Sequence, residues 1–306
     1  MSLRNLRSFV EAFRCQSLSE AAHNLGLTQP AVSQHIASLE AQLGRKLFER
    51  QPRGVVATAF ARDLAAQIGD GLDRAEAALA TMRARSSDLS GVVHIAGPPE
   101  LMAERIAPLM RDLVEAGLDA RIHLGGKVSL YDALLKGEVD LAFTASEPSD
   151  AGLASTSIGT ELLMAVASPA MAVRITSQPD LAAALKREPH VAYDMDRPLL
   201  RQWCATNQID LDTRQPSVTA ADLRLLRAMV ETEVGWSVIP DYLCADAIRA
   251  GRLVPIDGPS PAPGNKLYLV WAKSSLRHPR VAYARDVVLS GLERFRSSLD
   301  PITRTR

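Results

Sequence analysis

Two short helices joined by a tight glycine turn are the feature near the amino terminus that most constrains the fold. Ser19 is a candidate N-cap for the first helix, and Gly26 can end that helix in the left-handed conformation. After one intervening residue, Thr28 is a candidate N-cap for the next helix, and Pro30 lies in its first turn, where a missing N–H costs nothing. The first helix carries a short apolar stripe of Ala21, Ala22 and Leu25. The chain therefore has to turn sharply between two adjacent helices.

The helix after this turn has two different faces. Its apolar residues step by four, three and four positions, a spacing that buries one side: Val32, Ile36, Leu39 and Leu43. An earlier amphipathic helix offers a surface to pack against, with Leu6, Phe9, Val10 and Phe13 at helical spacing. The opposite face carries small or hydrogen-bonding groups, Pro30, Ser33, Gln34 and Ala37, with Gln29 at the amino end. A solvated face is one explanation, because helix-turn-helix geometry also occurs in proteins that do not bind DNA.

Recognition of DNA bases is the other explanation of this polar face. The major groove admits one α-helix, and short groups that donate and accept hydrogen bonds can reach base edges from it. The amides of Gln29 and Gln34 can pair with adenine, and the Ser33 hydroxyl can donate or accept. The hydroxyls of Thr28 and Ser38 are suited to phosphate contacts.

A short pair of β-like segments follows between Phe48 and Val56. Arg53 lies at its tip, where it is placed to enter the minor groove. The whole chain carries 35 Lys and Arg residues against 35 Asp and Glu residues, so any DNA footprint must be local. Two local basic groups meet this need, Arg4, Arg7 and Arg14 against Glu11, and Arg45, Lys46, Arg50 and Arg53 against Glu49.

An alanine-rich stretch that Thr58 caps predicts one long helix reaching about Arg85. Its apolar residues repeat by four and three, as in the seam of a two-helix coil: Leu64, Ile68, Leu72, Ala75, Leu79 and Met82. Such a helix spans on the order of 40 Å and has no obvious partner within the chain. We therefore expect a second copy of the protein as its partner, with a polar hinge after it at 86–91.

From Val92 onward, short apolar runs alternate with amphipathic helices. The runs that read as strands are 92–96, 120–124, 139–144, 162–167, 191–193, 236–239 and 266–271. One helix is expected from Met102 to Gly117, a second from Ser129 to Gly137 with Asp132 in capping-box position, and a last one after Pro279. The βαβαβ order implies a parallel sheet flanked by helices, in two α/β subdomains with a cleft.

Several classes of protein receive little support. The sequence has neither a signal peptide nor an apolar run long enough to span a bilayer, so we expect a cytoplasmic protein without membrane contact. Cys15, Cys204 and Cys244 are odd in number and far apart, which indicates reduced thiols. A redox pair of Cys204 and Cys244 is the alternative.

The amino-terminal residues from Leu3 to Arg53 closely resemble the DNA-binding domain of LysR-type transcriptional regulators. The matching positions are Ser19, Ala21, Ala22, Leu25, Thr28, Gln29, Ala31, Val32, Ser33, Ile36, Leu39, Glu40, Leu43, Gly44, Leu47, Phe48 and Arg50. The resemblance continues at Thr58 and, more weakly, at Gly137, Asp140 and Leu141, which match a Gly-x-x-Asp-Leu element. Two departures are Ala61, where the family usually has glycine, and Gly235, which stands alone where the family commonly has two glycines.

The resemblance implies an α/β fold overall, with a winged helix-turn-helix, a long dimerising linker helix and an effector domain similar to periplasmic binding proteins. The implied domains are 1–58 for DNA binding, 59–90 for the linker and hinge, and 91–306 for the effector. Subdomain I is then 91–161 with 267–306, and subdomain II is 162–266. The implied DNA-binding set is Ser19, Ala22, Thr28, Gln29, Pro30, Ala31, Ser33, Gln34, Ser38, Arg50 and Arg53. The implied partners are double-stranded promoter DNA, a small-molecule effector and further copies in a homodimer or homotetramer, with RNA polymerase as a further candidate.

Loops after the strand ends should line an effector crevice. The candidates are Pro98, Pro99, Glu100, Val128, Ser129, Thr144, Tyr193, Asp194 and Trp236. Many LysR relatives have Ser or Thr where this chain has Glu100, so Glu100 with Asp194 would make an acidic mouth that favours an amine. Alternatively, Glu100 only stabilises a helix start, and Lys127 with Arg201 could receive an anion.

An enzyme is the main alternative from another class, since doubly wound sheets often host catalysis. Residues 235–239 lack the final glycine of a nucleophile elbow, residues 125–127 do not make a P-loop, and no G-x-G-x-x-G is present. The histidines show no ligand spacing: His23, His35, His94, His123, His190 and His278. We therefore expect no catalytic residues, no metal and no cofactor. A binding protein without a regulatory role would leave the amino-terminal domain unexplained.

Overall fold

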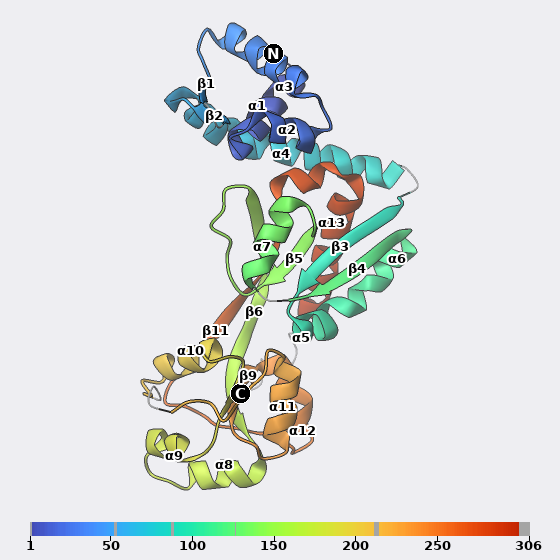
Figure 1. Cartoon of the computed structure of the whole chain (residues 1–306). Coiled ribbons are helices and arrows are strands. Elements are labelled where there is room, and N and C mark those ends of the chain that lie inside the picture. The colour runs from blue at the N-terminus through green and yellow to red at the C-terminus, as the bar shows by residue number, and fades with distance from the viewer. Residues whose placement is uncertain (1, 52–53, 87–88, 126, 211–213, 300–306) are drawn as a thin grey trace. The chain divides into compact units, whose positions relative to one another are not determined.

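A computed structural model describes residues 2–51, 54–86, 89–125, 127–210 and 214–299 (Figure 1). The chain forms two compact units. The first comprises Met1–Ser90, Ser149–Ala154 and Ala272–Ala284, and the second comprises Gly91–Pro148, Ser155–Trp271 and Arg285–Arg306. The expected α/β class with a helical amino-terminal domain is confirmed.

Three helices and a hairpin begin the first unit: α1 (Leu3–Cys15), α2 (Leu18–Leu25), α3 (Gln29–Leu43), β1 (Phe48–Gln51) and β2 (Gly54–Ala57). Gly26 ends α2 with a φ of 64°, and the Thr28 hydroxyl accepts from the Ala31 N–H at 3.4 Å, as expected. The N-cap of α2, however, is Ser17, which accepts from the Glu20 N–H at 3.2 Å. The expected cap, Ser19, lies within the first turn of that helix.

The hairpin packs against the turn that follows α1. The Val55 N–H donates to the Gln16 carbonyl at 3.2 Å, and Gly54 has a φ of 135°. A Cβ at Gly54 would lie 2.7 Å from that carbonyl oxygen, so a larger residue cannot replace it without a shift. The Glu40 carboxylate fixes the other end of the hairpin, because it accepts from the N–H groups of Leu47 at 2.8 Å and Phe48 at 3.3 Å.

The long helix α4 (Ala59–Ser86) starts at the expected cap, since the Thr58 hydroxyl accepts from the Ala61 N–H at 3.1 Å. The first half of its seam is not left open for a second copy. Leu64, Ile68 and Leu72 pack into the core that Phe9 and Val10 of α1 occupy. The expectation that this part of the helix has no partner within the chain is wrong, because α1 of the same chain packs against it.

The described part of the second half of the seam, from Ala75 onward, is more exposed than the first half. Ala75 is exposed and Leu79 is 50% exposed, while the side chain of Met82 lies outside the described residues.

A buried ion cluster also ties α4 to α1. The Arg7 guanidinium lies 3.1 Å from the carboxylates of Asp73 and Glu76 and 3.5 Å from that of Glu11. Arg14 binds the Asp73 carboxylate as well. Arg7 and Arg14 were two members of the expected basic group, and they are occupied within the protein instead of facing DNA.

The main sheet of the second unit has a strand path that runs β10, β6, β11, β5, β3 and β4, with β9 paired to β6. The bounds are β3 (Gly91–Gly97), β4 (Leu118–Leu124), β5 (Leu141–Thr144), β6 (Leu153–Ala167), β9 (Ser237–Pro240), β10 (Val254–Pro255) and β11 (Gly264–Ala272). Strand β3 is parallel to β4 and β5, as the βαβαβ order predicts. Strand β11 runs antiparallel to β5. The long strands β6 and β11 link the two α/β subdomains (Figure 1).

The first helical region of this unit is broken where one helix was expected. It comprises α5 (Pro99–Leu101), a π turn (Met102–Ile106), a 3-10 turn (Ala107–Leu109) and α6 (Met110–Glu115). Pro108 has no N–H to continue an α-helical ladder. Helix α7 (Lys127–Lys136) begins two residues before Ser129, so Ser129 is not its cap.

The remaining elements include a second, two-stranded parallel sheet of β7 and β8. They are α8 (Pro169–Thr176), α9 (Leu181–Arg187), β7 (Val191–Ala192), α10 (Pro198–Thr206), β8 (Val218–Thr219), α11 (Leu223–Glu231), α12 (Asp241–Arg249), a 3-10 turn (Lys273–Arg277) and α13 (Pro279–Leu299). Cys204 and Cys244 are buried in two different apolar clusters, and all three cysteines are free of disulfides. In the described part of the chain, no helix has both the length and the apolar character needed to cross a membrane.

Candidate DNA-binding face and effector cleft

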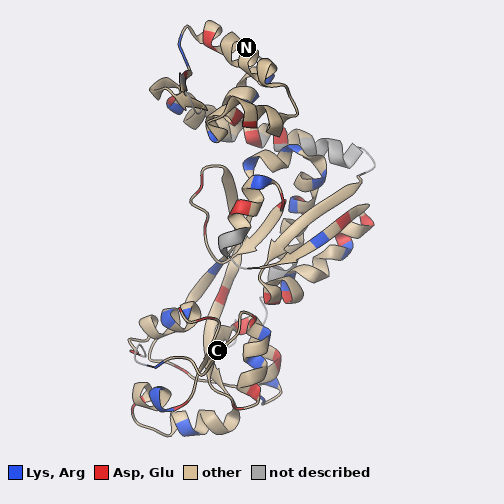
Figure 2. Cartoon of the chain, in the orientation of Figure 1, with Lys and Arg blue, Asp and Glu red and all other residues tan. Residues whose placement is uncertain are grey.

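Helix α3 presents the polar face that the sequence predicts. Val32 and Leu39 are completely buried, whereas Gln29, Pro30 and Gln34 are exposed. Ser33 and Ala31 are half-buried. Between Gln29 and Leu43 the helix carries one charged side chain, Glu40 (Figure 2). Direct contacts from α3 to bases would therefore use neutral amides and hydroxyls.

Helix α1 holds α3 through two polar contacts that sequence reasoning missed. The Asn5 amide donates to the Ser38 hydroxyl at 3.2 Å. The Ser8 hydroxyl and the His35 Nδ1 lie 2.8 Å apart in a further hydrogen bond. Asn5 and Ser8 are both buried, so these contacts fix the orientation of α3 from inside the domain.

Some residues of the expected DNA-binding set do not lie on this face. Ala22 is 3% exposed and packs in the three-helix core, so it positions α2 and α3 without reaching DNA. Arg50 lies in β1 with its side chain outside the described residues, and Arg53 lies outside the described residues altogether. Thr28 is exposed at the start of α3.

Several expected effector residues do gather where strands of the second unit end. Glu100 lies in α5, just after β3, and is 5% exposed. Thr144 is buried at the end of β5, and its hydroxyl accepts from the Ser146 N–H at 3.2 Å. Tyr193 follows β7, and the charge of Glu100 contributes to a raised pKa of its phenol, although burial is the larger cause.

The other expected effector residues have mixed outcomes. Pro98 and Pro99 are half-buried beside Glu100. The Asp194 carboxylate accepts from the Arg197 N–H at 2.8 Å. Val128 and Ser129 belong to the first turn of α7, but their side chains lie outside the described residues.

Trp236 is a core residue and does not line a cleft. It is completely buried, and its indole N–H donates to the Leu185 carbonyl at 3.2 Å. Its ring packs edge-on against Trp203 and tilted against His190. The expectation that Trp236 lines the effector crevice is therefore wrong, because the apolar run to which it belongs packs in the core of subdomain II.

Glu161 is a buried acid in the middle of β6 that sequence reasoning missed. It is 8% exposed, and its Oε1 accepts from the Asn265 amide of β11 at 2.7 Å. Burial raises the pKa of its carboxyl to about 7, and the carboxylates of Asp241 and Glu100 act in the same direction. The sequence signal that could have identified Glu161 is its position directly before the apolar run 162–167.

Tyr242 of α12 lies beside this acid. Burial is the main cause of a raised pKa for its phenol, and the charges of Glu161 and Glu100 add to it. The Arg105 guanidinium stands 4.7 Å from the centre of its ring. Residues from α5, the π turn, β6, β11 and α12 therefore meet at one place within the second unit (Figure 1).

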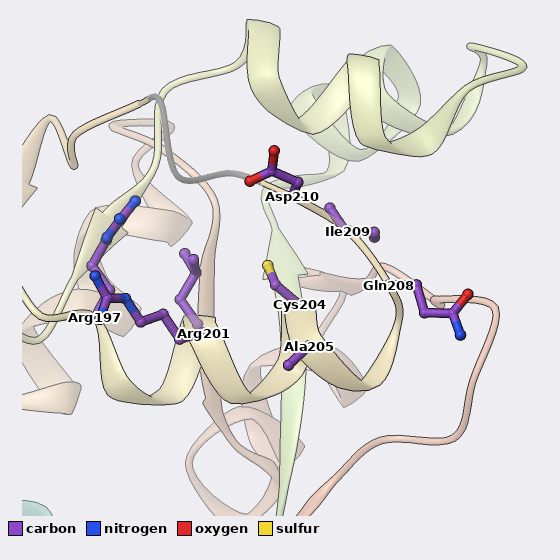
Figure 3. A pocket seen from close by; sticks show the side chains of 8 residues that line it. Arg197, Arg201, Cys204, Ala205, Gln208, Ile209 and Asp210 are labelled. Atoms are coloured by element: carbon purple, nitrogen blue, oxygen red, sulfur yellow. The ribbon is translucent and has the colours of Figure 1, made fainter.

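A separate pocket of about 500 Å³ lies beside α10 (Figure 3). Arg197 and Arg201 lie near each other on one side of it, and Cys204 and Asp210 lie further along. Arg201 was a candidate for binding an anion at the crevice. It lines this pocket, whose described lining contains none of Glu100, Thr144 and Tyr193.

Two histidines that lie far apart in the sequence meet across neighbouring strands. His94 Nδ1 and His123 Nε2 are 2.9 Å apart, and their rings stack with centroids 5.2 Å apart. Within the described ranges, no group of three or more His, Cys, Asp or Glu side chains is arranged to hold a metal ion.

Comparisons with known families agree with both halves of the chain. Residues 3–62 match the family described as "Bacterial regulatory helix-turn-helix protein, lysR family", and residues 86–293 match the "LysR substrate binding domain". The transcriptional regulator AbaB of Streptomyces antibioticus is 34% identical over 292 residues, which are 94% of this chain and 97% of AbaB. The regulator TrpI of Pseudomonas aeruginosa is 28% identical over 253 residues, or 82% of this chain and 85% of TrpI.

Solved structures show the same fold. CrgA, a LysR-type regulator of Neisseria meningitidis, superposes with a TM-score of 0.58 at 20% identity, over 95% of this chain and 99% of CrgA. LysG of Corynebacterium glutamicum with bound effector Arg gives a TM-score of 0.56 at 19% identity, over 96% of this chain and 99% of LysG. These families consist of transcriptional regulators and not of enzymes. The chain therefore belongs to the LysR family of bacterial transcriptional regulators, with a DNA-binding helix-turn-helix followed by an effector-binding domain.

Proposed function

We propose that α3 reads promoter DNA in the major groove and that a small molecule bound between the two subdomains of the second unit controls this binding. The observation that carries the proposal is the burial pattern of α3, with Val32 and Leu39 fully buried and Gln29 and Gln34 exposed. Helix α1 holds α3 in place. The neutral amides on the exposed face of α3 are better suited to hydrogen bonds with base edges than to contacts with a row of phosphates.

Within this face, each polar group has a distinct role. Gln29, Ser33 and Gln34 contact bases, and Thr28 contacts a phosphate at the helix start. Ser38 has its oxygen engaged by Asn5 and keeps its hydroxyl proton for a second phosphate.

The test uses an operator selected from random duplexes by the wild-type protein. We expect Gln34→Ala to weaken specific binding in gel shifts by about 1 to 3 kcal/mol and to relax the preference at one base position. Gln42→Ala is the matched control, because Gln42 is exposed near the end of the same helix and faces no base in this arrangement. If Gln29, Ser33 and Gln34 are all replaced by alanine and neither binding strength nor sequence preference changes, the proposed reading face is wrong.

The working form is a homodimer that pairs through the exposed part of α4 and assembles further into a tetramer. LysR regulators form oligomers, and Leu79 of α4 is half exposed on a helix whose earlier seam is already filled. In this scheme residues 1–58 bind DNA, 59–90 link and pair, and 91–306 bind the effector. Two α3 helices brought together by a twofold axis favour an inverted-repeat operator. The protein acts in the cytoplasm, where RNA polymerase is a further partner at the promoter.

The effector site consists of the residues that gather after the strand ends. Glu100, Thr144, Tyr193 and Asp194 form its described part, with Pro98 and Pro99 beside them. Val128 and Ser129 at the start of α7 complete the predicted rim.

A further inference from the structure

We propose that the effector carries a protonated amine and that the carboxylate of Glu100, supported by Glu161, neutralises its charge. The inference rests on the proposed effector site and adds the chemical class of its ligand. It is carried by an unpaired buried oxygen of Glu100 and by a second buried carboxyl beside it.

One carboxylate oxygen of Glu100 accepts no hydrogen bond from the described part of the protein. Its side chain is 95% buried, and its Oε2 atom has no hydrogen-bond partner there. The N–H groups of Glu100 itself and of Leu223, at the start of α11, hydrogen-bond to the same carboxylate and favour its charged form. A buried carboxylate oxygen without a donor costs free energy, so the site favours a ligand that brings one.

Glu161 adds a second buried carboxyl from a different element. Glu100 follows β3, whereas Glu161 lies on β6, which links the subdomains, and each charge raises the free energy of ionising the other. Burial raises the pKa of both carboxyls, and that of Glu161 reaches about 7. A cation between them would remove both the repulsion and the desolvation cost.

The arginines around this pair are engaged elsewhere. Arg224 binds Asp222 with its Nε at 3.0 Å and Nη2 at 2.7 Å. Arg105 stacks on the ring of Tyr242. Among the described residues, no ion pair joins either arginine to Glu100 or Glu161. Their nearby charges lower the pKa of Glu100 and Glu161 only as smaller effects than burial.

The surroundings favour an organic cation over a metal ion. A metal site needs several oxygen or nitrogen ligands, and no cluster of three candidate ligands exists among the described residues. The phenol rings of Tyr193 and Tyr242 lie within electrostatic reach of Glu100. Aromatic faces attract alkylammonium and guanidinium groups, as Arg105 on Tyr242 already illustrates.

A purely structural role for Glu100 explains less of the geometry. An acid in the first turn of a helix satisfies that helix's own N–H groups, and the Glu100 carboxylate does so for its own N–H. One of the two backbone donors on Glu100, Leu223, belongs to the other subdomain. The Oε2 atom has no hydrogen-bond partner in the described part of the protein.

Proton linkage distinguishes an amine from an anion. A bound ammonium would lower the pKa of Glu161 and Glu100, so binding would release a proton and strengthen as the pH rises. For one proton the affinity gain approaches about tenfold per pH unit below pH 7. An alkylammonium stays charged throughout this range, since its pKa is about 10. An anionic ligand would require the carboxyls to stay protonated and would bind more weakly as the pH rises.

The experiment screens the full-length protein by thermal shift against amines, alcohols and carboxylates of matched carbon skeleton. The five-carbon set is 1,5-diaminopentane, 1,5-pentanediol and glutarate, and amino acids extend the panel. Hits are measured by calorimetry between pH 5.5 and 7.5 in wild type, Glu100→Gln and Glu161→Gln. Glu147→Gln is the control, because Glu147 is an exposed acid of the same unit.

We expect amines to stabilise the wild type and Glu147→Gln, with affinity that rises with pH. Glu100→Gln should lose at least about tenfold in affinity, because a neutral amide can accept a hydrogen bond from an ammonium but cannot form an ion pair with it. The inference is overturned if no amine of the panel binds, if carboxylates stabilise the wild type instead, or if Glu100→Gln binds amines as well as the wild type does. Glutamine has nearly the same shape as glutamate. An unchanged melting temperature of Glu100→Gln without ligand shows that this variant is folded.

The outcomes also separate this inference from the function on which it rests. A carboxylate that binds and alters the operator footprint would overturn the amine class and leave effector control intact. Amine binding that depends on Glu100 but never alters the footprint would support the ligand class and contradict effector control.

Discussion

Replacing Glu161 by glutamine should stabilise the ligand-free protein, and the gain should appear only as the pH rises. The folded protein holds the Glu161 carboxyl in a buried place where its pKa is about 7, against 4.5 for an exposed glutamate. A raised pKa means that the folded state binds the proton more tightly than the unfolded state does. Stability from this group is therefore fully present below pH 4.5 and is lost as the pH rises through about 7.

The size of the effect follows from that difference in pKa. At about 1.4 kcal/mol for each pKa unit, ionising Glu161 in the folded state costs about 3 kcal/mol of folding free energy at pH 8. Glutamine cannot ionise, and its carbonyl oxygen can still accept from the Asn265 amide that now lies 2.7 Å from Oε1. Glu161→Gln should therefore exceed the wild type's free energy of unfolding by only about 1 kcal/mol at pH 5 and by about 3 kcal/mol at pH 8.

Tryptophan fluorescence during urea unfolding of the full chain measures the difference in free energy of unfolding between Glu161→Gln and the wild type in the second unit. All three tryptophans, Trp203, Trp236 and Trp271, lie in the second unit and are buried. Burial lowers the pKa of His190 to about 4, so its contribution to stability changes with pH in the opposite direction. Because both proteins contain His190, its contribution cancels in the difference between them.

A difference that stays constant from pH 5 to pH 8 would refute the reasoning, whatever its sign. Glu147→Gln gives the baseline, since Glu147 is exposed and its replacement should leave the pH profile of stability unchanged. A gain of the same size in that control would point to a general reduction of net charge instead of to burial at Glu161.

Three further outcomes are expected. Asp73→Ala should lower the stability of the first unit by about 3 kcal/mol in hydrogen exchange, because it leaves buried Arg7 and Arg14 without a shared partner; exchange rates like those of the wild type would contradict this. Leu79→Asp should shift light scattering at micromolar concentration towards smaller species, and an unchanged mass would exclude this part of α4 from the interface. His190→Phe should lower the pH of acid unfolding of the second unit, because the wild type loses stability as the pH falls from 6.5 towards 4; an unchanged midpoint would contradict that.

The amino-terminal domain could be predicted almost completely because its signals are local. Gly26, Thr28 and Thr58 each fix a helix boundary through their own backbone or hydroxyl, and the burial of Val32 and Leu39 follows from helical spacing. The one error in capping, Ser19 for Ser17, arose because two serines lie two residues apart and either hydroxyl could reach an N–H of the first turn.

The buried acid site could not be predicted in the same way. Glu161 and Asn265 are 104 residues apart and meet only because β6 and β11 both cross between the subdomains. Glu100 was identified from its place after a strand, but its burial and its unpaired oxygen depend on α11 approaching from the other subdomain. The periodicity of apolar residues describes one helix or strand at a time. It does not predict which residues of different elements come into contact.

The seam of α4 shows the same limit within the first unit and has a consequence for DNA binding. Apolar residues spaced by four and three positions predict that one side of a helix will be covered. They do not predict which partner covers it. Here α1 covers it as far as Leu72 and binds Asp73 through Arg7, while its other polar contacts, from Asn5 and Ser8, hold α3. Helix α1 thus joins α3, the proposed reading helix, rigidly to α4, the proposed pairing helix. In a dimer formed through α4, the distance between the two reading faces would therefore be set by how the α4 helices pair, and any change in that pairing would change the operator spacing that the dimer can bind.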